Sequence, residues 1–310
     1  MLSAMFDRLS PRVRAISQAL FVTFLWSTSW VLIKIGLQDI PALTFAGLRY
    51  ALAFACLLPF ALRAGQLASR PAGLALLRRL PARTWGQLIG LGLLFISITQ
   101  GAQYVSLVYL PAVTTSLLLS FTPAVVAMLS IRLLAERPTP LQWGGTAIYL
   151  AGVLVYFYPV SLPASQMVGL AVAIVGVLAN ALSSIMGRHV NRGGELDAMT
   201  VTVVSMGSGA AVLLAGGLLT QGLPHLTPVH WGIVLWLAAV NSAFAFTLWY
   251  HSLRTLSAME SSIINNTMLI QIALLAWAFL GEELTGRQVI GMLLAGLGTL
   301  AVQLRPPAHD

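Results

Sequence analysis

Charged side chains are scarce in this chain. Of its 310 residues only 8% are Asp, Glu, Lys or Arg, whereas 58% are hydrophobic. A soluble domain of this length needs a polar surface, and so few charges cannot cover one. The mean hydropathy of +0.86 instead predicts a chain dissolved in lipid, where a spanning helix takes roughly 20 mostly apolar residues. The apolar runs are long and lack the alternation of barrel strands, so we expect helices.

Cysteine and catalytic motifs are also missing. The one cysteine, Cys56, lies in an apolar run and cannot form an internal disulfide, so we interpret it as a small core residue. The sequence contains no HExxH, GxSxG, phosphate-binding loop, CxxC or paired-carboxylate pattern, and each of these would indicate a particular chemistry. We therefore expect no catalytic residue, no metal site and no cofactor, in a protein that is not an enzyme.

The basic excess, a net charge of +8, does not predict nucleic-acid binding, because the charges lie between apolar runs rather than in one patch. Prolines and glycines separate these runs. The pattern predicts an all-α integral membrane protein with ten transmembrane helices, at residues 18–36, 42–62, 86–108, 112–133, 141–158, 166–189, 198–220, 230–253, 259–280 and 286–304.

The basic residues divide unequally between the two sides of such a chain. Fourteen of the 17 fall on the side of the N-terminus, two (Lys34 and Arg287) fall on the other side, and Arg49 lies within the second span. Because positive residues stay in the cytoplasm, we expect both termini to be cytoplasmic. We also expect a multi-pass location in a bacterial inner (plasma) membrane, with lipid around the outer helix faces.

The second half of the sequence repeats the first at an offset of 146 residues. Shared residues include Trp85/Trp231, Gly86/Gly232, Tyr104/Tyr250, Ser106/Ser252, Glu136/Glu282, Thr139/Thr285, Gln142/Gln288, Gly145/Gly291 and Gly152/Gly298. The repeat predicts two domains, 1–160 and 161–310, with five helices each. An odd number makes the second half enter the membrane from the opposite side, and such inverted repeats are an architecture of secondary transporters.

Two segments carry a resemblance to a known family. Tyr109–Val153, and its second copy from Leu256 to Gly286, resemble the helix 4–5 signature of the EamA family in the drug/metabolite transporter superfamily. The resemblance implies two inverted five-helix repeats around a central cavity, as in bacterial exporters of aromatic amino acids and other metabolites. Many members carry Glu-Pro within helix 4, where this chain has Thr122-Pro123. Because this chain lacks the carboxylate that could couple transport to protons, we expect the solute to move down its own gradient.

Polar and aromatic side chains at membrane depth usually face a cavity or the protein interior. Amide groups would hold the carboxylate or amine of an amphiphilic metabolite, and rings would stack on its apolar part. The residues predicted to bind substrate are Trp26, Trp30, Gln100, Gln103, Tyr104, Thr122, Asn180, Ser184, Trp249, Tyr250 and Asn266.

Several alternatives stay open at this point. Aromatic stripes also pack helices together, and Glu260 is either a helix-start acid or a proton carrier. Leu213 is expected to face lipid. The leading hypothesis is an exporter of small metabolites, with aromatic amino acids first. A nucleotide-sugar or drug carrier of the same superfamily is less favoured, because only Arg49 offers a buried cation for phosphate. A membrane enzyme or a non-transporting scaffold is the alternative of another class, and the sequence does not decide between monomer and homodimer.

Overall fold

The structure is a computed structural model that describes residues 10–67, 81–133, 139–158, 163–192, 198–252, 255–256 and 258–303. All regular secondary structure in these ranges is helical, which confirms the all-α prediction. Within the described residues, eight helical stretches are long and apolar enough to cross a bilayer: Pro11–Gly36, Ala42–Leu62, Ala82–Tyr109, Ala112–Leu129, Ala164–Gly187, Met199–Gln221, Pro228–Trp249 and Ile263–Leu280.

Eight of the ten predicted spans thus meet the length and composition of a membrane helix. The other two are α9 (Pro140–Phe157) and α15 (Gly286–Gln303), and the stretch Gly286–Val302 of α15 is a shorter apolar helix. The first turns of α9 read Pro-Leu-Gln-Trp-Gly-Gly, which lowers the hydropathy of that helix. The multi-pass membrane protein predicted from composition is confirmed.

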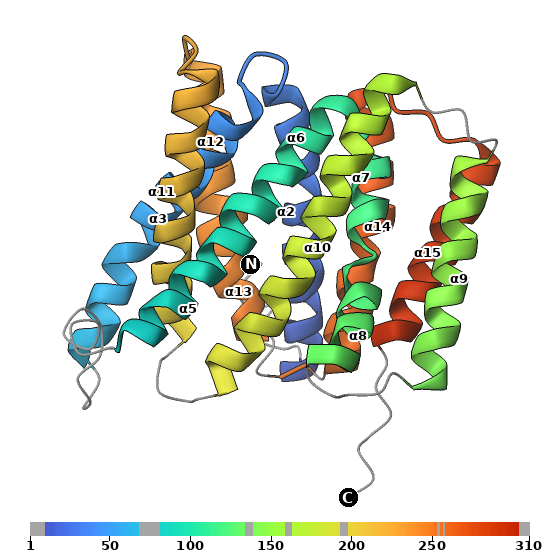
Figure 1. Cartoon of the computed structure of the whole chain (residues 1–310), viewed down its shortest axis with the longest axis horizontal. Helices are drawn as coiled ribbons and strands as arrows, with labels where there is room; N and C mark the ends of the chain where they lie inside the picture. The colour runs from blue at the N-terminus through green and yellow to red at the C-terminus, as the bar shows by residue number, and fades with distance from the viewer. Residues whose placement is uncertain are drawn as a thin grey trace, which may run out of the picture. The chain divides into compact units, whose positions relative to one another are not determined.

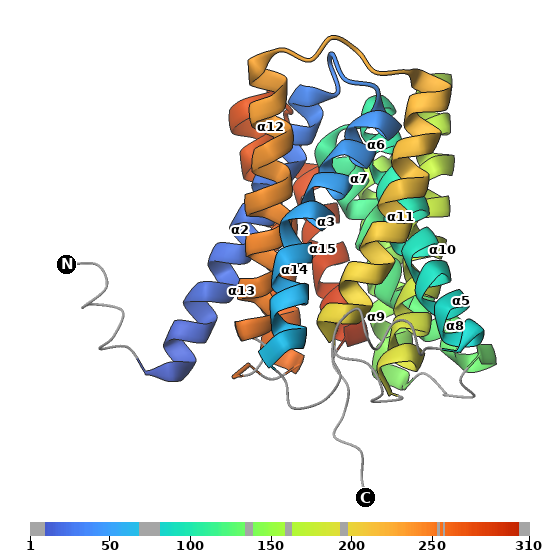
Figure 2. The same cartoon turned by 90° about the vertical axis from the view of Figure 1, so that its left-hand side faces the viewer.

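The helices, which are labelled in Figures 1 and 2, belong to two compact units. The first unit contains α2 (Pro11–Gly36), α7 (Ala112–Leu119), α8 (Thr122–Leu133), α9, α13 (Ala245–Ser252), α14 (Ala258–Leu280) and α15. The second unit contains α3 (Ala42–Leu67), α5 (Ala82–Gly92), η1 (Leu93–Gln100), α6 (Gly101–Tyr109), α10 (Ala164–Arg192), α11 (Ala198–Gln221), α12 (Pro228–Ala238) and η2 (Ala239–Phe244). Each unit therefore takes helices from both halves of the sequence.

In the first unit, α9 and α15 lie side by side (Figure 1) and meet at glycines. A methyl group on Gly152 would lie 2.6 Å from the carbonyl oxygen of Gly291, and one on Gly145 would lie 2.7 Å from that of Gly298. In the reverse direction, a methyl group on Gly291 would lie 2.7 Å from the Gly152 carbonyl oxygen, and one on Gly298 would lie 2.6 Å from that of Gly145. The helices run antiparallel at a separation that small residues permit. Gly291 is the repeat partner of Gly145, and Gly298 is that of Gly152, so the two contacts exchange partners between the two copies. Such reciprocal contacts are those of a local two-fold axis.

In the second unit, α11 packs on α3 through the same kind of contact. A methyl group on Gly217 would lie 2.5 Å from the backbone nitrogen of Thr44. At the end of the same contact, the Thr44 hydroxyl donates to the Gly222 carbonyl (2.9 Å), and the Leu43 N–H donates to the Gln221 side chain (2.8 Å). Small residues and terminal hydrogen bonds thus fix α11 against α3.

The prediction that Leu213 faces lipid is wrong. Its side chain is 5% exposed, because it fills the space beside Gly101. Leu219, six residues further along α11, is 87% exposed and is the appropriate surface residue on this helix. An apolar helix carries leucine on every face, so sequence alone does not separate the two.

Two predicted helices, 86–108 and 230–253, contain π-helical segments in their middle. The segment η1 begins at Leu93 and η2 begins at Ala239, which is the repeat offset of 146 residues. Hydroxyl groups bond to carbonyls five residues earlier, from Thr99 to Leu94 (2.8 Å) and from Ser242 to Leu237 (3.0 Å). Such wide turns occur often at functional sites.

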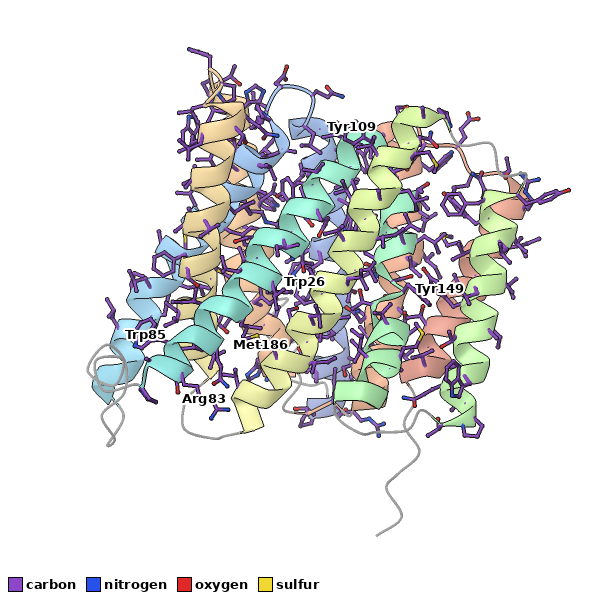
Figure 3. All side chains as sticks on the ribbon, viewed as in Figure 1. Trp26, Arg83, Trp85, Tyr109, Tyr149 and Met186 are labelled. Atoms are coloured by element: carbon purple, nitrogen blue, oxygen red, sulfur yellow. The ribbon has the colours of Figure 1, made fainter. Side chains whose placement is uncertain are left out.

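The predicted helix 112–133 is interrupted at Ser120 and Phe121, between α7 and α8, and Pro123 is the second residue of α8. Because proline has no N–H, the Leu119 carbonyl loses its helical partner. The Thr122 hydroxyl replaces that partner at 2.8 Å. The hydroxyl of Tyr149 on α9, the residue labelled in Figure 3, donates to the nearby Leu117 carbonyl at 2.7 Å. The single helix predicted at 112–133 is therefore divided into two, and the carbonyl that Pro123 frees is satisfied by a side chain.

Candidate functional site

In the first unit, Trp26 of α2 meets two aromatic side chains of α13. Its ring centroid lies 5.3 Å from that of Phe246 and 5.2 Å from that of Trp249, with tilted planes. We call Trp26, Phe246 and Trp249 the aromatic cluster. Its rings are half-buried rather than enclosed, so part of each ring remains accessible. The fold therefore brings together two predicted substrate residues, Trp26 and Trp249, that are far apart in the sequence.

Beside this cluster, a polar network joins α2 to α14. The Ser27 hydroxyl donates to the Gln271 side-chain oxygen (2.9 Å). The Gln271 amide in turn donates to the hydroxyls of Thr23 (3.2 Å) and Thr267 (3.0 Å). Buried amides and hydroxyls satisfied in this way hold apolar helices in one register. The network fixes the face of α2 that lies next to Trp26.

The other predicted residues of the first unit have separate surroundings. Trp30 is buried on α2, and Asn266 is half-buried on α14. Thr122 is buried, and its hydroxyl hydrogen is used by the Leu119 carbonyl. Tyr250 lies on α13, but its side chain lies outside the described part of the chain, as does that of Glu260. Their roles stay predictions.

In the second unit, Arg49 of α3 lies at the centre of a buried polar group. It is 5% exposed. Its Nε donates to the Ser242 hydroxyl of η2, and its Nη1 donates to the Tyr104 hydroxyl of α6, both at 3.2 Å. The guanidinium also lies 5.2 Å from the ring centroid of Tyr50. Three helices that are remote in sequence thus converge on one cation.

Tyr104, a predicted substrate residue, is fully buried in this group. Its ring contacts Phe45 edge to face, with 5.2 Å between centroids. A fully buried ring is not available for stacking, and the hydroxyl is the polar group that Tyr104 contributes to the contact with Arg49. A variant at Tyr104 should therefore remove the hydroxyl and keep the buried ring.

The remaining predictions in the second unit concern amides and a serine. Gln100 ends η1, Gln103 follows on α6, and both are half-buried. On α10 the Asn180 carbonyl accepts from the hydroxyls of Ser183 and Ser184 at 2.8 Å, and Ser184 is exposed. The Ser184 side chain is thus bonded to another predicted residue, Asn180, one turn earlier on the same helix.

Sequence reasoning missed several members of these groups. Thr23 and Ser27 are four residues apart on one face of α2, and this spacing was the available signal. Arg49 was recognised as a cation within a span, but its contacts with Tyr104 and Ser242 depend on the tertiary structure. Phe246 is not among the predicted residues, although it precedes Trp249 by three residues, the spacing of one helix face.

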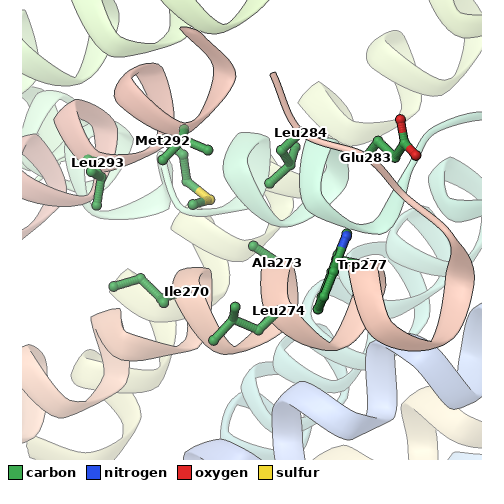
Figure 4. A pocket seen from close by; sticks show the side chains of 9 residues that line it. Ile270, Ala273, Leu274, Trp277, Glu283, Leu284, Met292 and Leu293 are labelled. Carbon is green, nitrogen blue, oxygen red and sulfur yellow. The ribbon is translucent and has the colours of Figure 1, made fainter. Parts of the chain in front are cut away.

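A pocket of about 440 Å³ lies between α14 and α15 (Figure 4). It is mostly apolar, and its lining residues are Ile270, Ala273, Leu274, Trp277, Glu283, Leu284, Val289, Met292 and Leu293. None of the predicted substrate residues lines it. A solute site needs several convergent polar groups, which this lining lacks, so the pocket is not the candidate site.

The apolar spans and the buried polar groups inside them define a multi-pass membrane protein. The model of the EamA-like transporter family matches residues 13–158 and again residues 167–304. The chain therefore belongs to the EamA-like transporter family, which confirms the resemblance found in the sequence. Transport, rather than enzymatic chemistry, is the activity of this family.

Individual relatives agree with this assignment. The chain is 24% identical to "Uncharacterized transporter YoaV" of Bacillus subtilis, over 89% of this chain and 92% of that protein. It is 28% identical to "Probable amino-acid metabolite efflux pump" of Salmonella typhimurium, over 90% of this chain and 92% of that protein. A crystal structure with 20% identity superposes with a TM-score of 0.65, covering 93% of this chain and 96% of that one. This last likeness concerns the fold.

Proposed function

We propose that this protein exports small amphiphilic metabolites across a bacterial inner membrane by alternating access, and that amino acids with an aromatic side chain are its first substrates. The observation that carries the substrate proposal is the aromatic cluster, where half-buried rings offer a stacking surface inside a membrane protein. A relative is named as a probable amino-acid metabolite efflux pump, which supports the same substrate class.

We further propose ten transmembrane helices in two inverted repeats of five, 1–160 and 161–310. Two observations support this arrangement: the family model matches the chain twice, and the glycines of α9 and α15 contact each other reciprocally. Two such halves can exchange conformations, which opens a central site to either side in turn. The residues predicted to bind substrate are proposed to line this path.

The proposal is tested by transport in proteoliposomes. Purified protein should release preloaded L-phenylalanine, L-tyrosine or L-tryptophan faster than L-glutamate or a sugar phosphate. Empty vesicles and vesicles containing the Trp249→Ala variant are the controls. Equal release of all solutes, or release at the rate of empty vesicles, would refute the substrate proposal.

We expect this transport to follow the solute gradient with little change from about pH 6 to about pH 8, the range in which histidine titrates. The reason is that Thr122 stands where many members of the family carry a glutamate before the proline of helix 4, so this chain lacks that coupling carboxylate. The measurement is the rate with and without a proton gradient. Accumulation driven by protons, and abolished by Glu260→Gln, would instead identify Glu260 as a proton carrier.

The proposed orientation predicts the location of fused reporters. Reporters after residues 70, 137 and 192 should be cytoplasmic, and those after residues 160, 224 and 284 should be periplasmic, because basic residues concentrate on the first side. Alkaline phosphatase and green fluorescent protein fusions provide the two readouts. A cytoplasmic signal at 224 would contradict the five-plus-five arrangement.

A further inference from the structure

Arg49 is the one charged residue among the buried side chains of the described ranges. Placing a guanidinium inside a membrane protein is costly unless it acquires partners, and intramembrane charges therefore mark functional positions. The hydrogen-bond partners of Arg49, Tyr104 and Ser242, are neutral hydroxyls. Within the described part of the chain, no carboxylate forms an ion pair with it. Its positive charge is left without a counter-ion there.

The hydrogen bonds of this group leave donors available. A guanidinium has five N–H donors, and the bonds recorded within the described ranges use one on Nε and one on Nη1. Tyr104 accepts the second of these bonds, so its own O–H hydrogen is a further donor. Three N–H groups of Arg49 and the O–H group of Tyr104 therefore lie close together. A carboxylate can accept hydrogen bonds from such a set of donors.

The backbone around Arg49 supports a binding role. Ser242 lies within the π-helical segment η2, and Tyr104 follows the π-helical segment η1 by four residues. One hydrogen-bond partner of Arg49 thus lies within a π-helical segment, and the other lies on the α-helix that directly continues one. π-Helical turns occur often at functional sites, whereas a pair of regular helices would suffice to hold a purely structural arginine.

We propose that Arg49, assisted by the Tyr104 hydroxyl, binds the carboxylate group of the exported solute. This inference rests on the proposed function, and it names the solute as a monocarboxylate such as an amino acid. One guanidinium balances one carboxylate, whereas a phosphate dianion would keep an uncompensated charge. The proposal concerns the second unit alone and does not require simultaneous contact with the aromatic cluster.

The test compares competitors that differ in charge. Efflux of labelled L-phenylalanine from proteoliposomes is measured against 3-phenylpropionate, which keeps a carboxylate, and phenethylamine, which lacks one. In Arg49→Gln the inhibition constant of 3-phenylpropionate should rise roughly 10- to 100-fold, as expected for loss of hydrogen bonds to a charged group, while that of phenethylamine stays constant. Arg49→Lys and Tyr104→Phe should give smaller shifts in the same direction. The exposed Arg287→Gln is the matched control and should leave both constants unchanged.

A purely structural Arg49 would change both inhibition constants equally, and that result would overturn the proposal. If Arg49→Gln fails to fold, Arg49→Lys and Tyr104→Phe still provide the comparison. Thermal unfolding in detergent is a second measurement: stabilisation by 3-phenylpropionate should be smaller in Arg49→Lys and Tyr104→Phe than in the wild type, whereas stabilisation by phenethylamine should be unchanged. Absence of stabilisation by 3-phenylpropionate refutes the carboxylate site. Failure of the wild type to move any aromatic solute refutes the proposed function separately.

Discussion

Substitution of Gly298 by alanine is expected to lower the free energy of unfolding by about 1–3 kcal/mol or more, the usual cost of overpacking. The added methyl group would lie 2.6 Å from the Gly145 carbonyl oxygen. Backbone cannot rotate away as a flexible side chain can, so α15 has to move from α9. Thermal unfolding in detergent, followed by size-exclusion chromatography, measures the loss.

Neighbouring glycines on the same helices provide matched controls. A methyl group on Gly296 would lie 3.7 Å from Leu269, an ordinary contact, and one on Gly144 would meet no atom within 4 Å. Gly296→Ala and Gly144→Ala should therefore be neutral or stabilising by about 0.5–1 kcal/mol, because alanine favours a helix. Gly145→Ala should be as damaging as Gly298→Ala. Equal unfolding temperatures for Gly144→Ala and Gly145→Ala would contradict the close contact.

Replacement of Trp249 by alanine should raise the apparent KM for an aromatic amino acid several-fold. Loss of one ring from a stacking surface costs about 0.5–1.5 kcal/mol beyond the lost area, and Trp26→Ala should have a comparable effect because the two rings are in contact. The measurement is initial efflux rate against solute concentration, at equal protein per vesicle. Leu219→Ala, at a highly exposed position, is the control and should leave the KM unchanged.

Abundance in the membrane separates binding from packing in this experiment, since Trp249 also packs against the buried cluster that contains Leu256 and Ile264. Wild-type KM for both tryptophan variants, at normal abundance, would show that these rings only hold helices together. Tyr104→Ala would be less informative, because removal of a fully buried aromatic side chain costs about 3–5 kcal/mol through the cavity alone. Tyr104→Phe removes the hydroxyl and preserves the packing.

The sequence predicted the apolar spans well because spanning a bilayer requires long apolar helices, whatever their neighbours. The single helix predicted at 112–133 is divided into α7 and α8 in the structure, because Pro123 removes a backbone donor. The sequence did not predict η1 or η2, since neither proline nor a glycine pair marks these turns. Arg49 was visible as a charge in a span, but its partners lie 55 and 193 residues away. Likewise, the repeat locates two related halves and does not say which helices pack together, so the composition of the compact units emerged only from the fold.

The matching positions of the two π-helical segments have an evolutionary consequence. A π turn closes its hydrogen bond around one more residue than an α turn, so it amounts to an insertion of one residue into a helix. Separate insertions after duplication would not be expected to fall at one register, yet η1 and η2 begin at the offset of a repeat that aligns without a gap. The wide turn therefore predates the duplication. Between Leu93 and Gln100 no residue is identical to its partner in the second copy, so the two copies have inherited the shape of the backbone while their side chains diverged.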